Sequence, residues 1–363
     1  MKAVRSSTSA ILRSPGFLKD ILNKVRFRDL LSKREYFLIG AFFIIVLTIL
    51  YINFFTPNYY TGTSPRRFEI KRGESLGSIA ERLHQEGIIP SEFKFKVAAY
   101  AFGAEKRIRS ARFYIPNGLS YAGLIDYFLT GKADVLRAIK IFDGSTVDGI
   151  AARLQNEVFI DSTQFTQYVN NQKLLDSLKL KGARSVEGYL LPGEYFIFER
   201  STPQEALQEL LKGMDRFLND TLKRDIAKSR YSLRQILTIA SIVNGETQKY
   251  DEMPRVAGVY YNRLRIGMRL QADPTVQYIL KERWRRLSLQ DLKINSPYNT
   301  YMYAGLPPGP INNPGKKAIL AAVYPEKNDY LYFVADGKGG HKFAATFSQH
   351  QKNVQEYRNS LNK

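Results

Sequence analysis

The chain has 363 residues, enough for two or three domains, and carries 54 Lys and Arg against 34 Asp and Glu, a net charge of +20. It has no cysteine, which excludes disulfides and thiolate metal sites, and its only histidines are His84, His341 and His350. Three scattered histidines argue against a zinc site, and neither an HExxH nor a P-loop pattern is present. We therefore expect no metal and no cofactor.

A basic tail and an apolar run open the chain. Residues 1–35 carry nine basic and three acidic side chains, and residues 36–55, YFLIGAFFIIVLTILYINFF, carry no charge. A helix of this length spans the roughly 30 Å of a bilayer core. The alternatives are a signal peptide, although no small-residue cleavage site follows before Thr56, and a buried core helix. The run predicts a single transmembrane helix, with the basic tail in the cytoplasm and the rest outside.

The segment after the apolar run predicts a linker and then a small domain. Residues 56–67 are rich in turn formers and hydroxyls, as linkers are. Residues 68–89 predict a strand, a turn at Gly73 and a helix capped by Ser75. This pattern is similar to a LysM module, which binds glycan containing N-acetylglucosamine, and a weaker echo lies at residues 139–155. The alternative is a plain strand–helix unit that only packs.

A later helix ends in an acid. Residues 233–246 predict a helix with Ser232 as its N-cap, and Ile239, Ile242, Val243 and Glu246 share one sector of it. A carboxyl buried among apolar groups has a raised pKa, which is how a general acid stays protonated near neutral pH. The alternative is that Glu246 leaves the apolar stripe at the helix end and meets water.

Two polar segments follow and have the layout of a cleft wall. The first is residues 262–278, and the second is a loop rich in Pro, Gly and Asn at residues 296–315. Their amide, guanidinium and hydroxyl groups can hydrogen-bond to a polar substrate. A role in supporting the fold stays open for each residue, and His341 is read as structural. The candidate substrate-binding residues here are Asn262, Arg263, Gln271, Asp273, Asn299 and Tyr301.

Five segments, in order, resemble the membrane-anchored endolytic murein transglycosylases (the MltG or YceG-like family). They are ASIVNGET (240–247), VAGVYYNRLRIGMRLQADPTVQY (256–278), YNTY (298–301), GLPPGPINNPG (305–315) and YLYFVADGKGGHKF (330–343). The resemblance implies a lytic transglycosylase that cleaves the bond between N-acetylmuramic acid and N-acetylglucosamine in nascent strands. It leaves 1,6-anhydro ends, terminates strand elongation, and works beside murein synthases (penicillin-binding proteins) at the inner membrane. Glu246 falls on the family's catalytic glutamate.

The chain departs from the family's pattern in two places. Asn244 stands where the family commonly has a second glutamate, and the loss of that charge is expected to lower the pKa of Glu246. Gly193 and Glu194 stand where an Asp-Thr pair is usual, which leaves Glu187 or Glu194 as substitutes, and we add Glu187 to the substrate-binding set. These departures motivate an alternative function, a catalytically weakened peptidoglycan-binding scaffold at the cell-wall synthesis machinery. A muramidase that uses water would need a second carboxylate opposite Glu246.

The expected fold is α+β, with a LysM-like small domain and a mixed α/β catalytic domain. Residues 56–363 carry 45 basic and 31 acidic side chains, and outside the cell we expect this charge to meet murein and anionic lipids rather than nucleic acid. The expected divisions are a cytoplasmic tail (1–35), a transmembrane helix (36–55), a linker (56–67), the LysM-like domain (68–135) and a periplasmic or extracytoplasmic catalytic domain (136–363).

Overall fold

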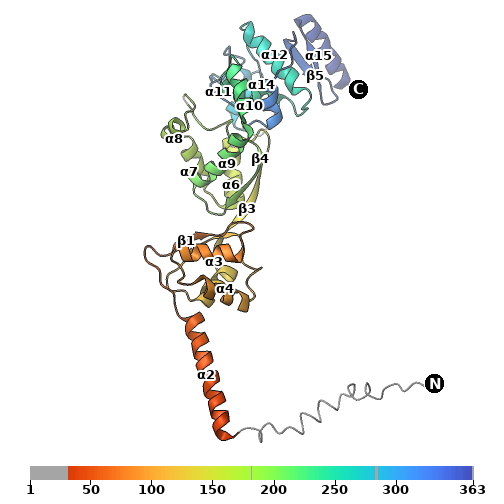
Figure 1. Ribbon diagram of the computed structural model, residues 1–363. Helices are drawn as coiled ribbons and strands as arrows, with labels where there is room; N and C mark the ends of the chain where they lie inside the picture. Colours follow the sequence, from red (N-terminus) through yellow and green to blue (C-terminus); the bar gives the residue numbers. More distant parts are fainter. Residues whose placement is uncertain (1–31, 181, 283–284, 362–363) are drawn as a thin grey trace, which may run out of the picture. The chain divides into compact units, whose positions relative to one another are not determined.

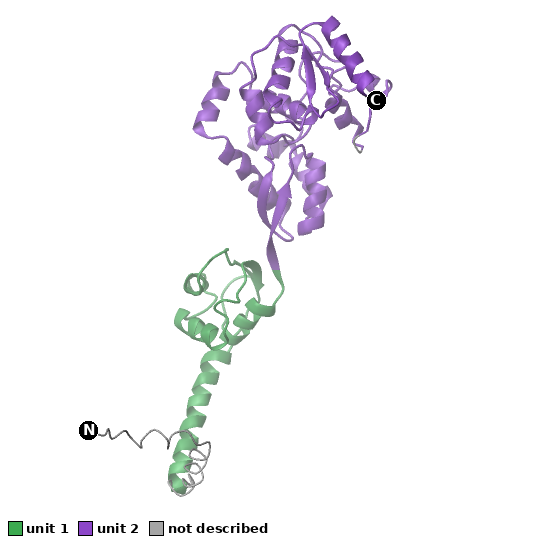
Figure 2. Cartoon of the chain, turned by 90° about the vertical axis from the view of Figure 1, so that its right-hand side faces the viewer, with its two compact units in different colours: residues 1–133 green, residues 134–363 purple. Residues whose placement is uncertain are grey.

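The computed structural model describes residues 32–180, 182–282 and 285–361 (Figure 1). The predictions for most of the basic tail lie outside these residues. The chain forms two compact units, residues 1–133 and residues 134–363 (Figure 2). Helices and strands occur in both, so the fold is of the mixed α+β class, with one long apolar helix near the N-terminus. The LysM-like character of the small domain stays a prediction.

The long apolar helix, α2, covers Lys33–Phe55. Ser32 starts it with a capping box, in which its hydroxyl accepts from the backbone of Glu35 and the Glu35 carboxylate accepts from the backbone of Ser32. The described side chains of α2 are all at least partly exposed, and the helix is long and apolar enough to cross a membrane. Near its C-terminal end, Phe54 packs against the core of unit 1.

Unit 1 is a small α+β unit in which Ser75 caps a helix as predicted, accepting from the backbone of Ser78 at 3.1 Å. Its two strands are antiparallel, and Phe68 lies opposite Phe113. Both side chains, together with Phe128, fill an aromatic core. The elements after α2 are β1 (Arg66–Glu69), α3 (Leu76–Gln85), α4 (Glu92–Ala101), β2 (Ala111–Ile115) and α5 (Tyr121–Thr130).

The first half of unit 2 packs helices against an antiparallel pair of strands. Ile139 lies opposite Tyr195 in this pair, and both are buried with the apolar faces of the helices. The elements are β3 (Ala133–Ile141), α6 (Val147–Val158), α7 (Ser162–Val169), α8 (Gln172–Ser177), β4 (Gly193–Phe198), α9 (Pro203–Phe217) and α10 (Asp220–Lys228).

The second half of unit 2 is built around one central helix, α11, in which residues 236–244 are all buried. A helix that is apolar all round is buried on every side, and α12 and α14 supply much of the cover. The elements are α11 (Leu233–Glu246), α12 (Met253–Arg265), α13 (Asp273–Leu280), η3 (Asp291–Lys293), α14 (Lys316–Val323), β5 (Tyr332–Ala335), β6 (His341–Ala344) and α15 (Phe347–Leu361).

Candidate active site

Glu246 is the last residue of α11, and its carboxyl is held by a tyrosine of the next helix. Ser232 starts α11 with the expected cap, which here is a full capping box with Gln235. At the other end, Glu246 is partly exposed, and its Oε1 accepts a 2.5 Å hydrogen bond from the buried hydroxyl of Tyr260 in α12. The carboxyl is therefore held by a hydrogen bond within the protein and is only partly in contact with water.

The surroundings of Glu246 raise its pKa from 4.5 to about 7. Burial is the main cause, because it disfavours the charged form. The hydrogen bond from Tyr260 lowers the pKa, the negative charge of Asp273 raises it, and the positive charge of Arg263 lowers it. Near pH 7 this carboxyl is therefore present in both protonation states. A residue that first donates and then accepts a proton needs both states.

Three of the candidate substrate-binding residues lie near Glu246. Asp273, the first residue of α13, is exposed and accepts a 2.5 Å hydrogen bond from the hydroxyl of Tyr301. Arg263 is buried, and its guanidinium donates to the backbone carbonyls of Leu331 at 2.7 Å and Leu270 at 2.5 Å. Asp273 and Arg263 act on Glu246 through charge, and the pKa of Tyr301 is raised by burial, Asp273 and Glu246.

The three amide candidates have other surroundings. Asn262 donates to the backbone carbonyls of Asn328 and Tyr330, at 2.8 and 3.1 Å. Asn299 is fully buried and donates to two carbonyls of the loop that precedes it, those of Leu292 and Ile294. Gln271 has an exposed side chain and a positive φ of 47°. Asn262 and Asn299 thus hold loops in place, and contact with substrate stays a prediction for all three.

Tyr260 is a residue that the sequence analysis did not single out. It is one of two adjacent tyrosines in the apolar helix α12, and it is almost fully buried. A buried tyrosine hydroxyl usually finds a hydrogen-bond partner. A tyrosine on the helix that follows the expected acid was therefore the sequence signal that could have predicted this contact. The neighbouring Tyr261 bonds elsewhere, to the carbonyl of Ala322 at 2.6 Å.

A cleft of about 900 Å³ opens in unit 2 next to the C-terminal end of α11. Gly245, next to Glu246, is one of its lining residues, together with Asn244 and Glu187. A Cβ at position 245 would lie 2.6 Å from Cβ of Pro274, so the glycine allows α11 and the start of α13 to approach closely. Close packing against Pro274 therefore explains the glycine at position 245, although glycine is unfavourable within a helix.

Glu187 is a buried carboxyl in the wall of the cleft. Both of its oxygens accept from the backbone N–H of Val147, the first residue of α6, at 3.0 Å, and Oε1 accepts from the amide of Asn313 at 2.7 Å. Burial raises the pKa of Glu187 to about 8, although these hydrogen bonds lower it. Glu194, the other substitute, is exposed on β4, opposite Lys140 in β3.

Asn313 joins the segments that form this wall. Its Oδ1 accepts from the backbone of Gly188 and Leu190, both at 2.9 Å, and its Nδ2 donates to Ser145 at 3.0 Å and to Glu187. The backbones of residues 144–145 and 313 also pair as a short antiparallel bridge. Asn313 is fully buried, and it uses both ends of its amide.

The segment 311–315 also bonds to α11. The backbone of Ile311 donates to the hydroxyl of Ser241 at 3.0 Å, and the backbone of Gly315 donates to Oδ1 of Asn244 at 3.1 Å. The amide of Asn312 donates to the carbonyl of Ser241 at 2.9 Å. Asn244 therefore fixes this segment two residues before the helix ends in Glu246, and the segment ties α11 to the Glu187 wall.

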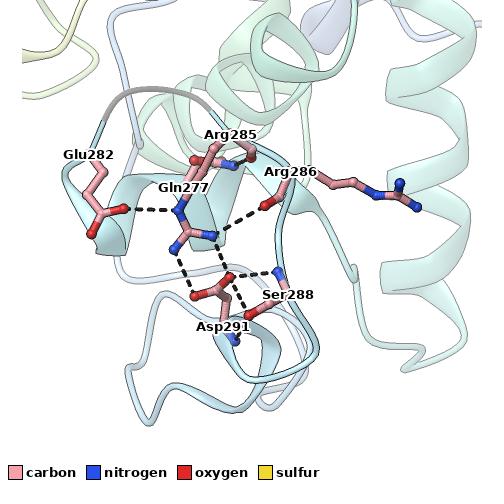
Figure 3. Close-up of polar contacts among 6 residues, drawn as sticks. All are labelled: Gln277, Glu282, Arg285, Arg286, Ser288 and Asp291. Carbon is pink, nitrogen blue, oxygen red and sulfur yellow. Dashed lines mark hydrogen bonds and ion pairs between the residues drawn. The ribbon is translucent and has the colours of Figure 1, made fainter.

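Another part of the cleft is supported by an ion-pair cluster (Figure 3). The guanidinium of Arg285 donates to both oxygens of Asp291, at 2.7 and 3.0 Å, and the backbone and hydroxyl of Ser288 donate to the same carboxylate. These bonds hold the pKa of Asp291 well below its usual range. The carbonyl of Arg285 accepts from the amide of the cleft residue Gln277, so the cluster holds the loop after α13 beside the cleft.

The described residues hold no group of three or more His, Cys, Asp or Glu that could bind a metal ion. Two carboxyls with raised pKa values lie in this part of the described chain: both oxygens of Glu187 accept bonds within the fold, whereas Glu246 has a pKa of about 7 and Oε1 fixed by Tyr260. His341 is engaged with Glu252, at 2.8 Å from Nδ1 to Oε2. The raised pKa and the fixed orientation of Glu246 are properties that general acid–base catalysis requires.

Comparison with known proteins places this chain in a family. The model of the YceG-like family matches residues 68–356, and the chain belongs to this family. It is 31% identical over 309 residues to an endolytic murein transglycosylase of Bacillus subtilis (strain 168), covering 81% of this chain and 85% of that protein. It is also 31% identical over 325 residues to one from Streptococcus pneumoniae serotype 2, covering 80% of this chain and 58% of that protein.

A solved structure has the same fold. The crystal structure of a yceG-like protein from Listeria monocytogenes superposes with a TM-score of 0.55 at 29% sequence identity, covering 80% of this chain and 99% of that one. The chain spans 58% of the length of the pneumococcal relatives, so those proteins have further regions that this chain does not match.

Proposed function

We propose that the protein is an endolytic murein transglycosylase, a lyase that cleaves peptidoglycan strands, and that α2 anchors it in a membrane. The observation that carries the proposal is the carboxyl of Glu246, which has a pKa of about 7 and ends a buried helix beside a 900 Å³ cleft. Relatives named endolytic murein transglycosylase, 31% identical over about four-fifths of the chain, support the substrate class.

The chemistry requires one carboxyl that acts twice. Protonated Glu246 gives its proton to the glycosidic oxygen between N-acetylmuramic acid and N-acetylglucosamine, and the bond from that oxygen to C1 breaks. The C6 hydroxyl of the same muramic acid attacks C1 and forms the 1,6-anhydro ring, and its proton passes to the Glu246 carboxylate. Because the nucleophile belongs to the substrate, its effective concentration is high and no second carboxylate is needed to activate water.

Each neighbour of Glu246 has an assigned part in this proposal. Tyr260 holds Oε1, so Oε2 is the oxygen that carries the transferred proton. Burial raises the pKa of Glu246, and the charge of Asp273 raises it further, so that the acid is partly protonated at neutral pH. Arg263, Gln271, Tyr301 and the cleft residue Glu187 are proposed to contact glycan or stem peptide.

The remaining assignments concern the setting of the enzyme. The basic flank before α2 favours a cytoplasmic N-terminus and a catalytic unit outside the inner membrane. The strand–turn–helix of unit 1, with Ser75 as its cap, supports a LysM-like glycan-binding module. Cleavage of nascent strands beside murein synthases would terminate their elongation.

The test is mass spectrometry of the products that the detergent-solubilised full chain makes from uncrosslinked murein strands. The chain and a Glu194→Gln control, which changes an exposed carboxyl on β4, should produce 1,6-anhydro ends, and Glu246→Gln should not. Reducing ends would instead mean hydrolysis, with Asp273 as the nearest candidate for the second carboxylate. Binding of strands without cleavage in all three proteins would favour the scaffold alternative.

A further inference from the structure

Helix α4 of unit 1 exposes large apolar side chains on the face that points away from its core. Phe93, Val97 and Tyr100 are spaced so that they share one face of the helix, and they are 73%, 37% and 62% exposed. The opposite face carries Phe95 and Ala98, which are buried in the core of unit 1. A helix on the surface of a soluble domain normally turns polar side chains outward, so this face has no explanation within the unit.

This apolar face lies close to the end of the candidate membrane helix. Helices α2 and α4 contact each other (Figure 1). The ring of Phe102, at the C-terminal end of α4, meets the ring of Phe55 edge-on with 6.5 Å between centroids. Phe55 is the last residue of α2 and of its uncharged run. If that run spans the roughly 30 Å hydrocarbon core, Phe55 lies at the headgroup level, and α4 lies at the same level.

The charge around the face fits the same environment. Residues 92–109, which hold α4 and the turn that follows it, carry five basic and two acidic side chains. Lys94, Lys106, Arg107 and Arg109 are exposed. Aromatic rings beside lysines and arginines are the usual composition of protein surfaces that lie in the lipid headgroup region, where the basic groups meet anionic lipids.

We propose that Phe93, Val97 and Tyr100 form a lipid-docking face by which α4 lies in the headgroup region of the bilayer that α2 spans. The occupant is the bilayer itself, because the face adjoins a membrane-spanning segment of the same chain and its flanks are basic. The inference rests on the proposed membrane anchor, and it adds that unit 1 lies on the membrane surface rather than being held away from it.

The absence of cysteine from the sequence allows a direct test, because any introduced cysteine is unique. Nitroxide labels are placed in the full chain at V97C on the proposed face, at Q85C on the exposed surface of α3, and at I45C within α2. The proteins are inserted into nanodiscs of phosphatidylcholine, alone or mixed with phosphatidylglycerol. Electron paramagnetic resonance then compares the access of oxygen, which concentrates in lipid, with that of a water-soluble nickel complex.

We expect the oxygen-to-nickel ratio to be several-fold higher at V97C than at Q85C and highest at I45C. Adding Phe93→Glu and Tyr100→Glu to V97C should bring its ratio down to that of Q85C. Phosphatidylglycerol should raise the ratio at V97C and leave that at Q85C unchanged, and equal values in the two lipid mixtures would overturn the role of the basic residues.

Two results would overturn the docking face and spare the anchor. One is a lipid-immersed I45C together with a V97C label that is as accessible to nickel as Q85C. The other is spin–spin broadening at V97C that disappears when unlabelled protein is added, because a second copy would then cover the face. A nickel-accessible I45C would instead overturn the anchor on which the inference rests.

Discussion

The hydroxyl of Tyr260 donates a 2.5 Å hydrogen bond to Oε1 of Glu246, and the bond joins the middle of one buried helix to the last residue of another. It stabilises the ionised carboxylate, whereas burial stabilises the protonated acid, and the two effects together with nearby charges leave the pKa at about 7. The protonation of the acid is therefore set by groups that can be changed one at a time.

Replacing Tyr260 by Phe removes the bond that lowers the pKa of Glu246. We expect the alkaline limb of the pH profile of kcat/KM to move to higher pH by about one unit, since a hydrogen bond to a charged group is worth roughly 1.5 kcal/mol. The control is Tyr261→Phe, which removes a bond to a backbone carbonyl instead. An unmoved limb in Tyr260→Phe, or equal movement in both variants, would contradict the assignment.

Replacing Asp273 by Asn should move the same limb in the opposite direction. The negative charge of Asp273 raises the pKa of Glu246, so its removal lowers that pKa and the alkaline limb moves to lower pH. Asp225→Asn is the control, because Asp225 bonds to Tyr324 and lies on α10. A shift to higher pH in Asp273→Asn would show that the carboxylate acts on the site by some means other than its charge.

Position 244 tests the departure from the family's pattern. Asn244→Glu places a negative charge two residues before the end of α11 and keeps an oxygen that can accept from Gly315. We expect it to raise the pKa of Glu246 and the pH optimum, by roughly one unit. Activity profiles of the two proteins that coincide across the pH range would refute the idea that Asn244 tunes the acid.

Glu187 predicts a dependence of stability on pH. Its pKa is about 8 in the folded protein against 4.5 for an exposed glutamate, so the folded state holds a proton that the unfolded state releases between these values. Stability is then full below about pH 4.5 and falls as the pH rises towards 8. Glu187→Gln should flatten this fall, as measured by thermal unfolding of the full chain at several pH values. The same dependence of stability on pH in both proteins would mean that a group other than Glu187 causes it.

Asn313→Ala should cost several kcal/mol of unfolding free energy, because it leaves the backbone N–H groups of Gly188 and Leu190 buried without their acceptor. The matched control is Asn359→Ala on the exposed surface of α15, where we expect a change within about 0.5 kcal/mol. Chemical denaturation of the two variants measures the difference, and similar losses would mean that the network around Asn313 contributes little.

Local features of the fold were predictable from sequence. The uncharged run, the caps Ser75 and Ser232, and an apolar helix ending in Glu246 each depend on residues within a few positions of one another, and the structure contains all of them. The mixed α+β class followed from the same patterns. Such signals are readable because capping and helical periodicity act over one or two turns.

The contacts that make the site could not be read in this way. Tyr260 lies fourteen residues from Glu246, Asn313 meets Ser145 across 168 residues, and Gly245 packs against Pro274 of another helix. The sequence shows which side chains need hydrogen-bond partners, but it does not show which partners they find. The amides of Asn262 and Asn299 illustrate this, since a loop's own carbonyls satisfy them as well as a sugar would.

The segment 311–315 also imposes an order of events on the chain. Ser145, Glu187 and α11 are all synthesised before it, and the segment bonds to each of them, through Asn313 and its neighbours. A nascent or proteolytically shortened chain that stops before residue 311 has Glu246 but lacks the segment that joins its helix to the opposite wall. The carboxyl of Glu246 is therefore made before the cleft wall beside it can be completed.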